Sequence, residues 1–452
     1  PRRSRHAERR VRPFRTRCQG GRFRQGIHPL TFPSSPTLYR AQAPGAMTTM
    51  SAHAHPFRHA HASDLSWQDS LEKVIAGLKA PPVAPLAPDA EELGFLFLGN
   101  ALYHVADRIL ETLQQRTGVQ RWAGVVANGV MSLDADYRLE PAICAMVGVF
   151  PKGSARFFTA EDPLPQALSD MPTPWWTALV YGDSRRGDLP AQLDEVAGLV
   201  RSGFVFGGLT QGAKQHALPT FVGDRVLQDG TLAGVAFRDH VLLQVRMTQA
   251  LKPLGGLHQI TLAHDNVIVE LDGKRALDVL DDEFFDHHPI PMPPHVSLLD
   301  LPAVLVDMGV YRTAHAAISR NNRQNMDHLA DLDLVALEDI DPSGGNLCMT
   351  QEMQTDTRLR FCVPDAKAAR ADMARMLTEL RDEITTQQLT IRGGIYVTDM
   401  TRPHAMFQEP GSELRMIREA LGDFPLVGYC SEAEVHRNVR HTHAGLLTLF
   451  VG

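Results

Sequence analysis

The stretch Pro425-Leu-Val-Gly-Tyr-Cys-Ser-Glu-Ala-Glu-Val435 joins an apolar strand pattern to a dense group of chemically capable side chains. An apolar run at residues 425–427 leads into Gly428. A thiol, a hydroxyl and two carboxylates follow at once: Cys430, Ser431, Glu432 and Glu434. Many α/β proteins present a site in this way, on an apolar strand that ends in small and polar residues. The stretch therefore predicts a buried strand with a candidate site at its end.

Similar apolar runs recur along the rest of the chain and alternate with helical patterns. Strands are predicted at residues 94–99, 122–126 and 142–150, among others. Amphipathic helices are expected from about Asp69 and from Pro364 onward, and Asn100 is predicted to cap a helix after the first of these strands. This order predicts an α/β fold with mixed sheets, built as two related layered domains with helices packed on the sheets.

The domain boundaries follow from shifts in composition. The proline-rich residues 289–294 separate a domain at 66–288 from a second domain at 289–452. Residues 1–65 are expected to be a disordered leader, and the His-rich residues 51–65 are assigned to it as a solvated segment in preference to a metal site. The earliest methionines are Met47 and Met50, so the preceding Arg-rich segment indicates upstream translated sequence, with an organelle transit peptide as the alternative.

Charge, hydropathy and cysteine usage exclude several classes of protein. Eleven of the arginines fall in residues 1–46, against a single acidic residue, so the remainder is more acidic than the net charge of -7 indicates. An acidic body argues against nucleic-acid binding. The sequence contains no apolar run of about 20 residues, as a membrane helix would need. The five cysteines form no paired pattern, which is typical of a cytoplasmic protein, and we predict no metal or cofactor.

At this point the chain resembles the FIST sensory family, with its N-terminal and C-terminal FIST domains. The resemblance covers about residues 66–452 and rests on the order of many weak motifs: 94–100, 122–132, 204–212, 220–237, 334–361, 394–407 and 425–434. The last two correspond to an apolar strand, a Cys-x-Gly-Arg-like turn, a helix and a Gly-Phe-x-x-x-Gly-Glu-like turn. The resemblance implies an intracellular protein that binds small ligands, such as amino acids or related metabolites, in signal transduction.

Some positions depart from the family pattern. Asp399 stands where the family often has Cys, Thr401 where it has Gly, and Ala433 replaces the Gly before Glu434, whereas Arg402 and Glu434 are retained. Arg402 suits a ligand carboxylate and Glu434 a ligand ammonium group, a combination that fits an amino acid. The alternative is an Arg402–Glu434 ion pair that only fixes two turns.

The other candidate ligand-binding residues are Cys430, Gly208, Thr210, Asn128 and Asp399. Backbone amides of the glycine-rich residues 207–212 could hold an anion, although a tight turn is the simpler reading. Asn128 with Gly129 is in the same way a polar contact at a strand end or only a turn.

Two further functions compete with a ligand sensor. A thiol-dependent enzyme would use Cys430, activated by His436 or His404, whereas a buried inert cysteine is the more common case. An adaptor would recruit a downstream signalling protein through its folded body. The absence of a catalytic triad or metal set favours a binding protein over an enzyme.

Overall fold

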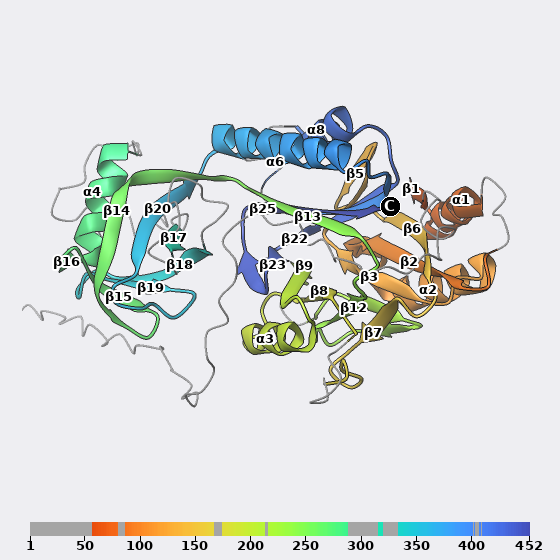
Figure 1. Cartoon of the computed structure of the whole chain (residues 1–452), viewed down its shortest axis with the longest axis horizontal. Helices are drawn as coiled ribbons and strands as arrows, with labels where there is room; N and C mark the ends of the chain where they lie inside the picture. Colours follow the sequence, from red (N-terminus) through yellow and green to blue (C-terminus); the bar gives the residue numbers. More distant parts are fainter. Residues whose placement is uncertain are drawn as a thin grey trace, which may run out of the picture. The chain divides into compact units, whose positions relative to one another are not determined.

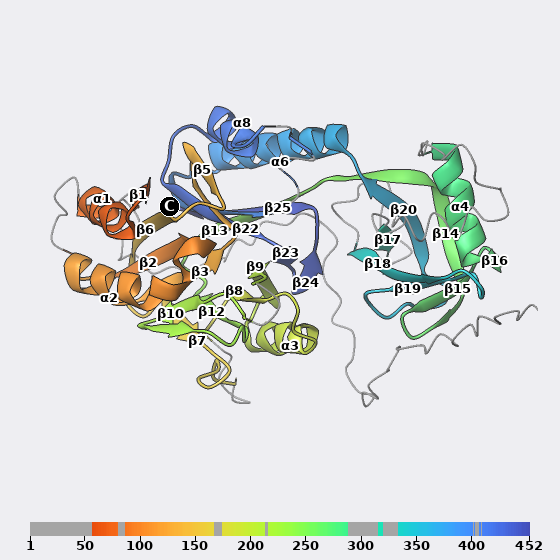
Figure 2. The same cartoon turned by 180° about the vertical axis from the view of Figure 1, so that it is seen from behind.

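The computed structural model describes residues 57–79, 86–166, 174–212, 216–287, 315–319, 333–400, 402, 406–407 and 409–452. Within them, 25 strands form four sheets, and six α-helices pack on these sheets. Most of these elements are labelled in Figure 1, and Figure 2 shows them from behind. Each sheet carries helices on its surface, which confirms the predicted α/β class with mixed sheets.

The first sheet contains, in spatial order, β1 (Arg58–Ser63), β6 (Ala142–Pro151), β2 (Ala90–Gly99), β3 (Trp122–Ala127), β10 (Thr220–Gly223) and β11 (Arg225–Leu227). Helices α1 (Trp67–Lys79) and α2 (Ala106–Thr117) pack on it, and the 3-10 helix η1 (Asn100–Val105) joins β2 to α2. Strands β2 and β3 are parallel.

The second sheet contains β7 (Ala155–Phe158), β12 (Ala233–Phe237), β8 (Thr177–Asp183), β9 (Phe204–Thr210), β23 (Ala433–His436) and β24 (Val439–His441). Its helix is α3 (Leu189–Leu199). The third sheet contains β13 (Leu243–Gln249), β25 (Ala444–Val451), β21 (Ile391–Asp399), β22 (Leu426–Ser431), β4 (Gly129–Ser132) and β5 (Ala135–Arg138). Its helices are α6 (Ala366–Thr386) and α8 (Ser412–Leu421).

These three sheets have the same topology. In each, a parallel pair joined by a helix (β2–β3, β8–β9 or β21–β22) has an antiparallel strand beside its first member and an edge strand beyond that. Beside its second member lies a hairpin that comes from another unit: β10–β11 on β3, β23–β24 on β9, and β4–β5 on β22. These three sheets, which we call the body, are therefore an internal threefold repeat whose units exchange hairpins. Through one of these hairpins, β4 of the first repeat pairs with β22 of the third.

One glycine per repeat marks equivalent positions. Gly124, Gly207 and Gly428 lie on the second strand of each parallel pair, where an added Cβ would sit 1.8–2.0 Å from a carbonyl oxygen of the first strand. Only glycine allows so close an approach. These positions give a common register for comparing side chains between the repeats.

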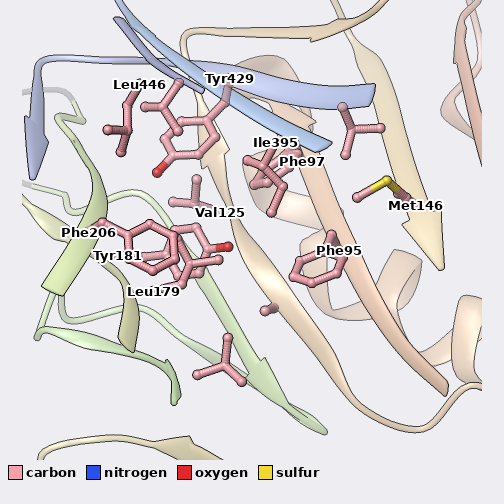
Figure 3. Packing of buried hydrophobic residues seen from close by; sticks show 14 of the residues in the cluster. Phe95, Phe97, Val125, Met146, Leu179, Tyr181, Phe206, Ile395, Tyr429 and Leu446 are labelled. Atoms are coloured by element: carbon pink, nitrogen blue, oxygen red, sulfur yellow. The ribbon is translucent and has the colours of Figure 1, made fainter. Parts of the chain in front are cut away.

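The three sheets share an apolar core. Figure 3 shows side chains of all three pointing into the same interior, among them Phe95, Phe97, Leu179, Tyr181, Phe206, Ile395, Tyr429 and Leu446. Burial of several aromatic rings, each worth about 1.5–3 kcal/mol, holds the repeats together.

The fourth sheet is antiparallel and is described by itself. It contains β14 (Leu251–His264), β20 (Arg358–Pro364), β17 (His315–Ser319), β18 (Asp333–Asp341), β19 (Asn346–Met349), β15 (Val267–Leu271) and β16 (Lys274–Arg275). Helix α4 (Ala276–His287) packs on it. It interrupts the third repeat between β13 and α6, and the flanking residues meet, because the amide of Asp365 donates to the carbonyl oxygen of Ala250 at 2.8 Å.

Most predicted elements are present, with two differences. Part of the predicted leader is a strand, β1, which pairs with β6 and places Ala60 and Ala62 against α1. In β1 histidines alternate with these alanines, so the segment lacks the apolar pattern that predicts a strand. Asn100 does not cap a helix with its side chain; its amide donates to Asn128 Oδ1 at 2.9 Å. The predicted boundary at residues 289–294 lies outside the described residues and stays a prediction.

Candidate functional site

The carboxyl ends of the parallel strands bring polar side chains of the three repeats together. Four residues beyond each marker glycine stand Asn128, Gln211 and Glu432. The side chain of Asn128 donates to the carbonyl oxygen of Gln211 at 3.3 Å and to Glu432, and the amide of Glu432 donates to the carbonyl of Leu209 at 2.8 Å. We call Asn128, Gln211 and Glu432 the rim. Two positions are neutral amides, and only the third repeat carries a carboxylate.

Behind the rim, the third repeat contains a buried charged network. Arg402 is fully buried and its Nε donates to Glu413 Oε1 at 3.0 Å. Its Nη1 donates to the carbonyl oxygens of His443 at 2.9 Å and of Thr248 at 3.3 Å, and the guanidinium lies over the ring of Phe407 at 5.3 Å. These contacts fix the position of the guanidinium plane.

Glu413 on α8 is the anchor of this network. It accepts hydrogen bonds from Tyr396 Oη at 2.7 Å and Thr398 Oγ1 at 3.0 Å, in addition to Arg402 Nε. Burial lowers the pKa of Arg402, but the charges of Glu413 and Glu434 raise it above its ordinary value, so the guanidinium is charged. A buried ion pair with this many hydrogen bonds is held in one geometry.

Glu434 is the second buried charge-bearing group of the site. It lies on β23, has no exposed surface, and accepts a hydrogen bond from Ser431 Oγ through Oε1. Burial, followed by the negative charge of Asp399, raises the pKa of Glu434 well above its usual range, against the opposing effect of Ser431 and Arg402. Folding therefore favours the protonated form of this carboxyl group.

Four buried side chains of this region have polar atoms with no hydrogen-bond partner among the described residues. They are Arg402 Nη2, Glu434 Oε2, Nδ1 of His441, which pairs with Glu434 between β23 and β24, and both Oε1 and Nε2 of Gln249. Each buried unpartnered polar group costs about 1–3 kcal/mol. Such groups stay in a protein when another molecule supplies their partner, so these atoms point to a ligand or to ordered water.

The Arg402–Glu434 ion pair, which was the alternative to a ligand site, is not formed among the described residues. Among the described residues, the ion pair of Arg402 is with Glu413, and Glu434 acts on Arg402 only as a nearby charge. Asp399, at the end of β21, is buried and accepts a hydrogen bond from the amide of His443 at 2.8 Å. Thr210 is buried at the end of β9, and Asn128 lies on the rim.

Two other candidate residues, Cys430 and Gly208, are packed inside strands. Cys430 is buried on β22, and burial raises its pKa to about 12, which is the opposite of an activated thiol. Gly208 lies inside β9 and not in a loop, where a Cβ would meet Val397 and Tyr429 at 2.5–2.7 Å. The glycine-rich residues 207–210 are therefore strand, and the predicted turn is wrong.

Models of both FIST domains match the chain, the FIST N domain over residues 92–274 and the FIST C domain over residues 276–437. The chain belongs to the FIST family. FIST domains are described as sensory domains in signal transduction. The N-terminal match covers the first two repeats except β1, α1 and the start of β2, and the C-terminal match contains most of the buried network.

Two curated relatives are similar to this FIST chain. They are the uncharacterized proteins MT0656 of Mycobacterium tuberculosis (strain CDC 1551 / Oshkosh) and Rv0628c of Mycobacterium tuberculosis (strain ATCC 25618 / H37Rv). Each is 23% identical over 251 residues, which is 55% of this chain and 61% of the relative. The matched part of the chain thus spans about three fifths of the length of these relatives.

Several members of the FIST site are not evident from the sequence. Glu413 lies eleven residues beyond Arg402 on an amphipathic helix. Gln249 is at the end of β13, and all residues of the fourth sheet separate it from Arg402 in the sequence. In the described part of the chain, no cluster of His, Cys, Asp and Glu side chains is arranged to hold a metal ion. None of the described helices combines the length and apolar character of a membrane span.

Proposed function

We propose that this FIST protein is an intracellular sensor that binds a small α-amino acid between Arg402 and Glu434. The observation that carries the proposal is a fully buried guanidinium and a fully buried carboxyl group, each with one unpartnered atom among the described residues: Arg402 Nη2 and Glu434 Oε2. An α-carboxylate suits the guanidinium edge, and an α-ammonium suits the carboxylate.

The repeat supports a functional role for Glu434, because the fold does not require a carboxylate at its position. Glu434 lies opposite Gly208, one residue beyond the marker glycine of its sheet. The equivalent residues are Val130, opposite Tyr429, and Thr220, opposite Val125, and both are buried. Two of the three repeats thus pack an uncharged side chain where the third buries a carboxyl.

Binding would be coupled to a proton. The raised pKa of Glu434 favours its protonated form in the free protein, whereas an ammonium group beside it favours the carboxylate. A ligand that binds one conformation better than another then shifts the population toward it, which is how occupancy would reach a downstream signalling partner in the cytoplasm. Cys430, being buried and of raised pKa, gives no support to a thiol-dependent enzyme.

A thermal-shift panel of the twenty amino acids tests the proposal. A ligand at about 100 times its Kd stabilises the folded state by about 2.7 kcal/mol, which is readily measured as a rise in Tm. We expect at least one amino acid to raise the Tm of the wild type and of Glu419→Gln, an exposed control on α8. Glu434→Thr, which takes the residue of another repeat, should lose the response. If no amino acid stabilises the wild type, the proposal is wrong.

A further inference from the structure

The hairpin that carries Glu434 places a histidine directly opposite it. Glu434 on β23 pairs with His441 on β24, so both side chains project from the same face of the hairpin. Side chains in such a pair have Cβ atoms about 4.5–5.5 Å apart. Both are buried, with 0% of Glu434 and 5% of His441 exposed. The two side chains are therefore close enough to contact one small group together.

This face of the hairpin lies toward the shared core of the body. Ala433 and Val435, which alternate with Glu434, belong to the apolar cluster of α3, so Glu434 points away from that helix. The other cross-strand neighbour of Glu434 is Gly208, whose carbonyl oxygen accepts a hydrogen bond from Tyr429 Oη at 2.9 Å. The acid and the imidazole thus lie beside a tyrosine of the shared core.

Each member of the pair has one atom held by the protein and one atom without a partner. Ser431 Oγ donates to Glu434 Oε1, and Oε2 has no hydrogen bond among the described residues. His441 Nε2 lies 3.3 Å from the carbonyl oxygen of His436. Because a carbonyl oxygen only accepts, Nε2 carries the proton. In the neutral ring Nδ1 is then a bare acceptor, and no donor reaches it in the described part of the chain.

Burial keeps the ring of His441 neutral. It lowers the pKa of His441 to about 4, against the opposing effect of the hydrogen bond to the His436 carbonyl. Nδ1 therefore needs a donor at neutral pH, and Glu434 Oε2 does not supply one, since neither atom has a partner. An ammonium group suits both atoms, because it has several N–H donors and its charge favours the carboxylate form of Glu434.

The other two exchanged hairpins have no such pair. The equivalent cross-strand pairs are Thr220 with Leu227 and Val130 with Tyr137. The fold therefore requires neither an acid nor an imidazole at these positions. Their occurrence together in the third repeat, buried and each with an unpartnered atom, points to a shared role in binding.

We infer that Glu434 Oε2 and His441 Nδ1 together bind the α-ammonium group of the amino acid, which makes His441 a specificity-determining residue for amines with at least two N–H groups. This inference rests on the proposed function and adds the residue that recognises the amine. An amine with a single N–H group serves one acceptor and leaves the other buried and unpartnered, which weakens binding.

Isothermal titration calorimetry with a matched pair of amines tests the inference. The probes are the amino acid that most raises the Tm in the panel and its derivative whose amine is methylated until one N–H group remains. For glycine the derivative is N,N-dimethylglycine. The derivative keeps the carboxylate, the side chain and the positive charge. We expect the wild type to bind the parent amino acid roughly tenfold or more tightly than the derivative.

Two variants of His441 separate hydrogen bonding from a steric effect of the methyl groups. His441→Leu takes the residue of Leu227 and has no acceptor, so it should bind the two amines about equally. A clash with the methyl groups would persist in this variant. In His441→Asn, Oδ1 takes the place of Nδ1, so the preference for the parent amino acid should be retained. Circular dichroism and Tm show whether each variant keeps the fold.

Nitrogen-15 NMR of wild type with labelled histidines gives a readout that a purely structural role would not move. The signals of His441 are those lost in either variant. We expect Nδ1 to carry no proton in the free protein and its signal to shift when the parent amino acid is added. A protonated Nδ1 would overturn the inference. A signal that stays in place while the amino acid binds would also overturn it, because only ordered water would then occupy Nδ1.

The outcomes distinguish this inference from the function beneath it. Equal affinities of the wild type for the two amines, or an unchanged preference in folded His441→Leu, would overturn the role of His441 and leave amino-acid binding intact. If the amino-acid panel is silent and the titrations produce no heat, the proposed function fails, and the inference fails with it.

Discussion

Glu434 and Arg402 show how a buried charge is tolerated at a functional position. Arg402 is kept charged by an ion pair with Glu413 and two backbone carbonyls, whereas burial raises the pKa of Glu434 and so favours its neutral form. The surroundings therefore favour the charged form of Arg402 and the neutral form of Glu434. A ligand ammonium group would change the state of Glu434 only.

The first prediction concerns the pH dependence of stability. Because the pKa of Glu434 is raised from 4.5 by folding, the folded state binds a proton that the unfolded state releases above about pH 4.5. Ligand-free wild type therefore loses stability as the pH rises, by up to about 1.4 kcal/mol per pH unit. Glu434→Gln removes this loss, so its advantage in the free energy of unfolding should grow from pH 4.5 toward neutral pH.

Denaturant unfolding at several pH values measures this difference. The groups that face Glu434 are Asp399, Arg402 and Ser431, and they are unchanged in the variant. The exposed Glu419→Gln serves as the control and should follow the wild type at every pH. Parallel stability curves for wild type and Glu434→Gln would contradict a raised pKa of Glu434 in the folded protein.

A second prediction concerns the thiol of Cys430. Because its pKa is raised from 9.0 to about 12, the thiolate fraction at neutral pH is about a thousandfold below that of an ordinary cysteine. We expect iodoacetamide to leave Cys430 unmodified in the native protein and to modify it in denaturant, as measured by peptide mass spectrometry. Rapid native labelling of Cys430 would revive the enzyme hypothesis.

At the scale of the elements, the marker glycines test the repeat. A Cβ at Gly428 would lie 2.0 Å from the carbonyl oxygen of Tyr396, so Gly428→Ala must separate β21 from β22. We expect a loss of about 2–4 kcal/mol, as for other overpacked buried sites. Gly198, exposed on α3 with open space around it, is the matched control, and Gly198→Ala should stabilise by about 0.5–1 kcal/mol. Similar small effects for both variants, measured by urea unfolding, would show that the close strand approach is wrong.

Local patterns predict elements well where one face is apolar. The predicted helix after Pro364 is α6, with Ala369, Met373 and Leu380 buried as expected from their spacing. The exchanged hairpins have no such signal, because β4 is only four residues long and pairs with β22 from the other end of the chain. Periodicity describes a single element and does not identify its partner.

In the candidate site, too, single residues were predictable from the sequence, whereas their contacts were not. Asn128 could be named because a polar residue at a strand end is visible in the sequence, and Arg402 and Glu434 because they are retained from the pattern of the family that the chain resembles. The partner of Arg402 could not, because Glu413 looks like an ordinary residue of an amphipathic helix and becomes a buried anchor only when α8 packs on β21. Long-range packing, which decides burial, also decides which charges meet.

At the scale of the whole molecule, the fourth sheet behaves as an insertion in the third repeat. Among the described residues, the apolar cluster of α4 and its sheet draws all its members from residues 251–364. The chain enters and leaves it at Ala250 and Asp365, which are hydrogen bonded. Insertions at such adjoining ends are tolerated by the host fold.

This leads to a deletion experiment. Joining Ala250 directly to Asp365 should give a soluble protein that unfolds cooperatively, because the shared core of the three repeats is untouched. Circular dichroism and thermal unfolding check the fold, and the amino-acid panel checks the site. A deletion variant that is soluble but lacks a cooperative transition would show that the insertion is part of the body's core.

The central claim is that Glu434 and Arg402 together hold an amino acid. Calorimetric titration of the amino acid that most raises the Tm of the wild type, into wild type and Glu434→Thr, tests it most directly. The account predicts a saturable 1:1 heat for the wild type and no heat for the variant, whose circular dichroism should match the wild type because Thr220 occupies the equivalent position in another repeat. Undiminished binding of that amino acid by Glu434→Thr would contradict the claim.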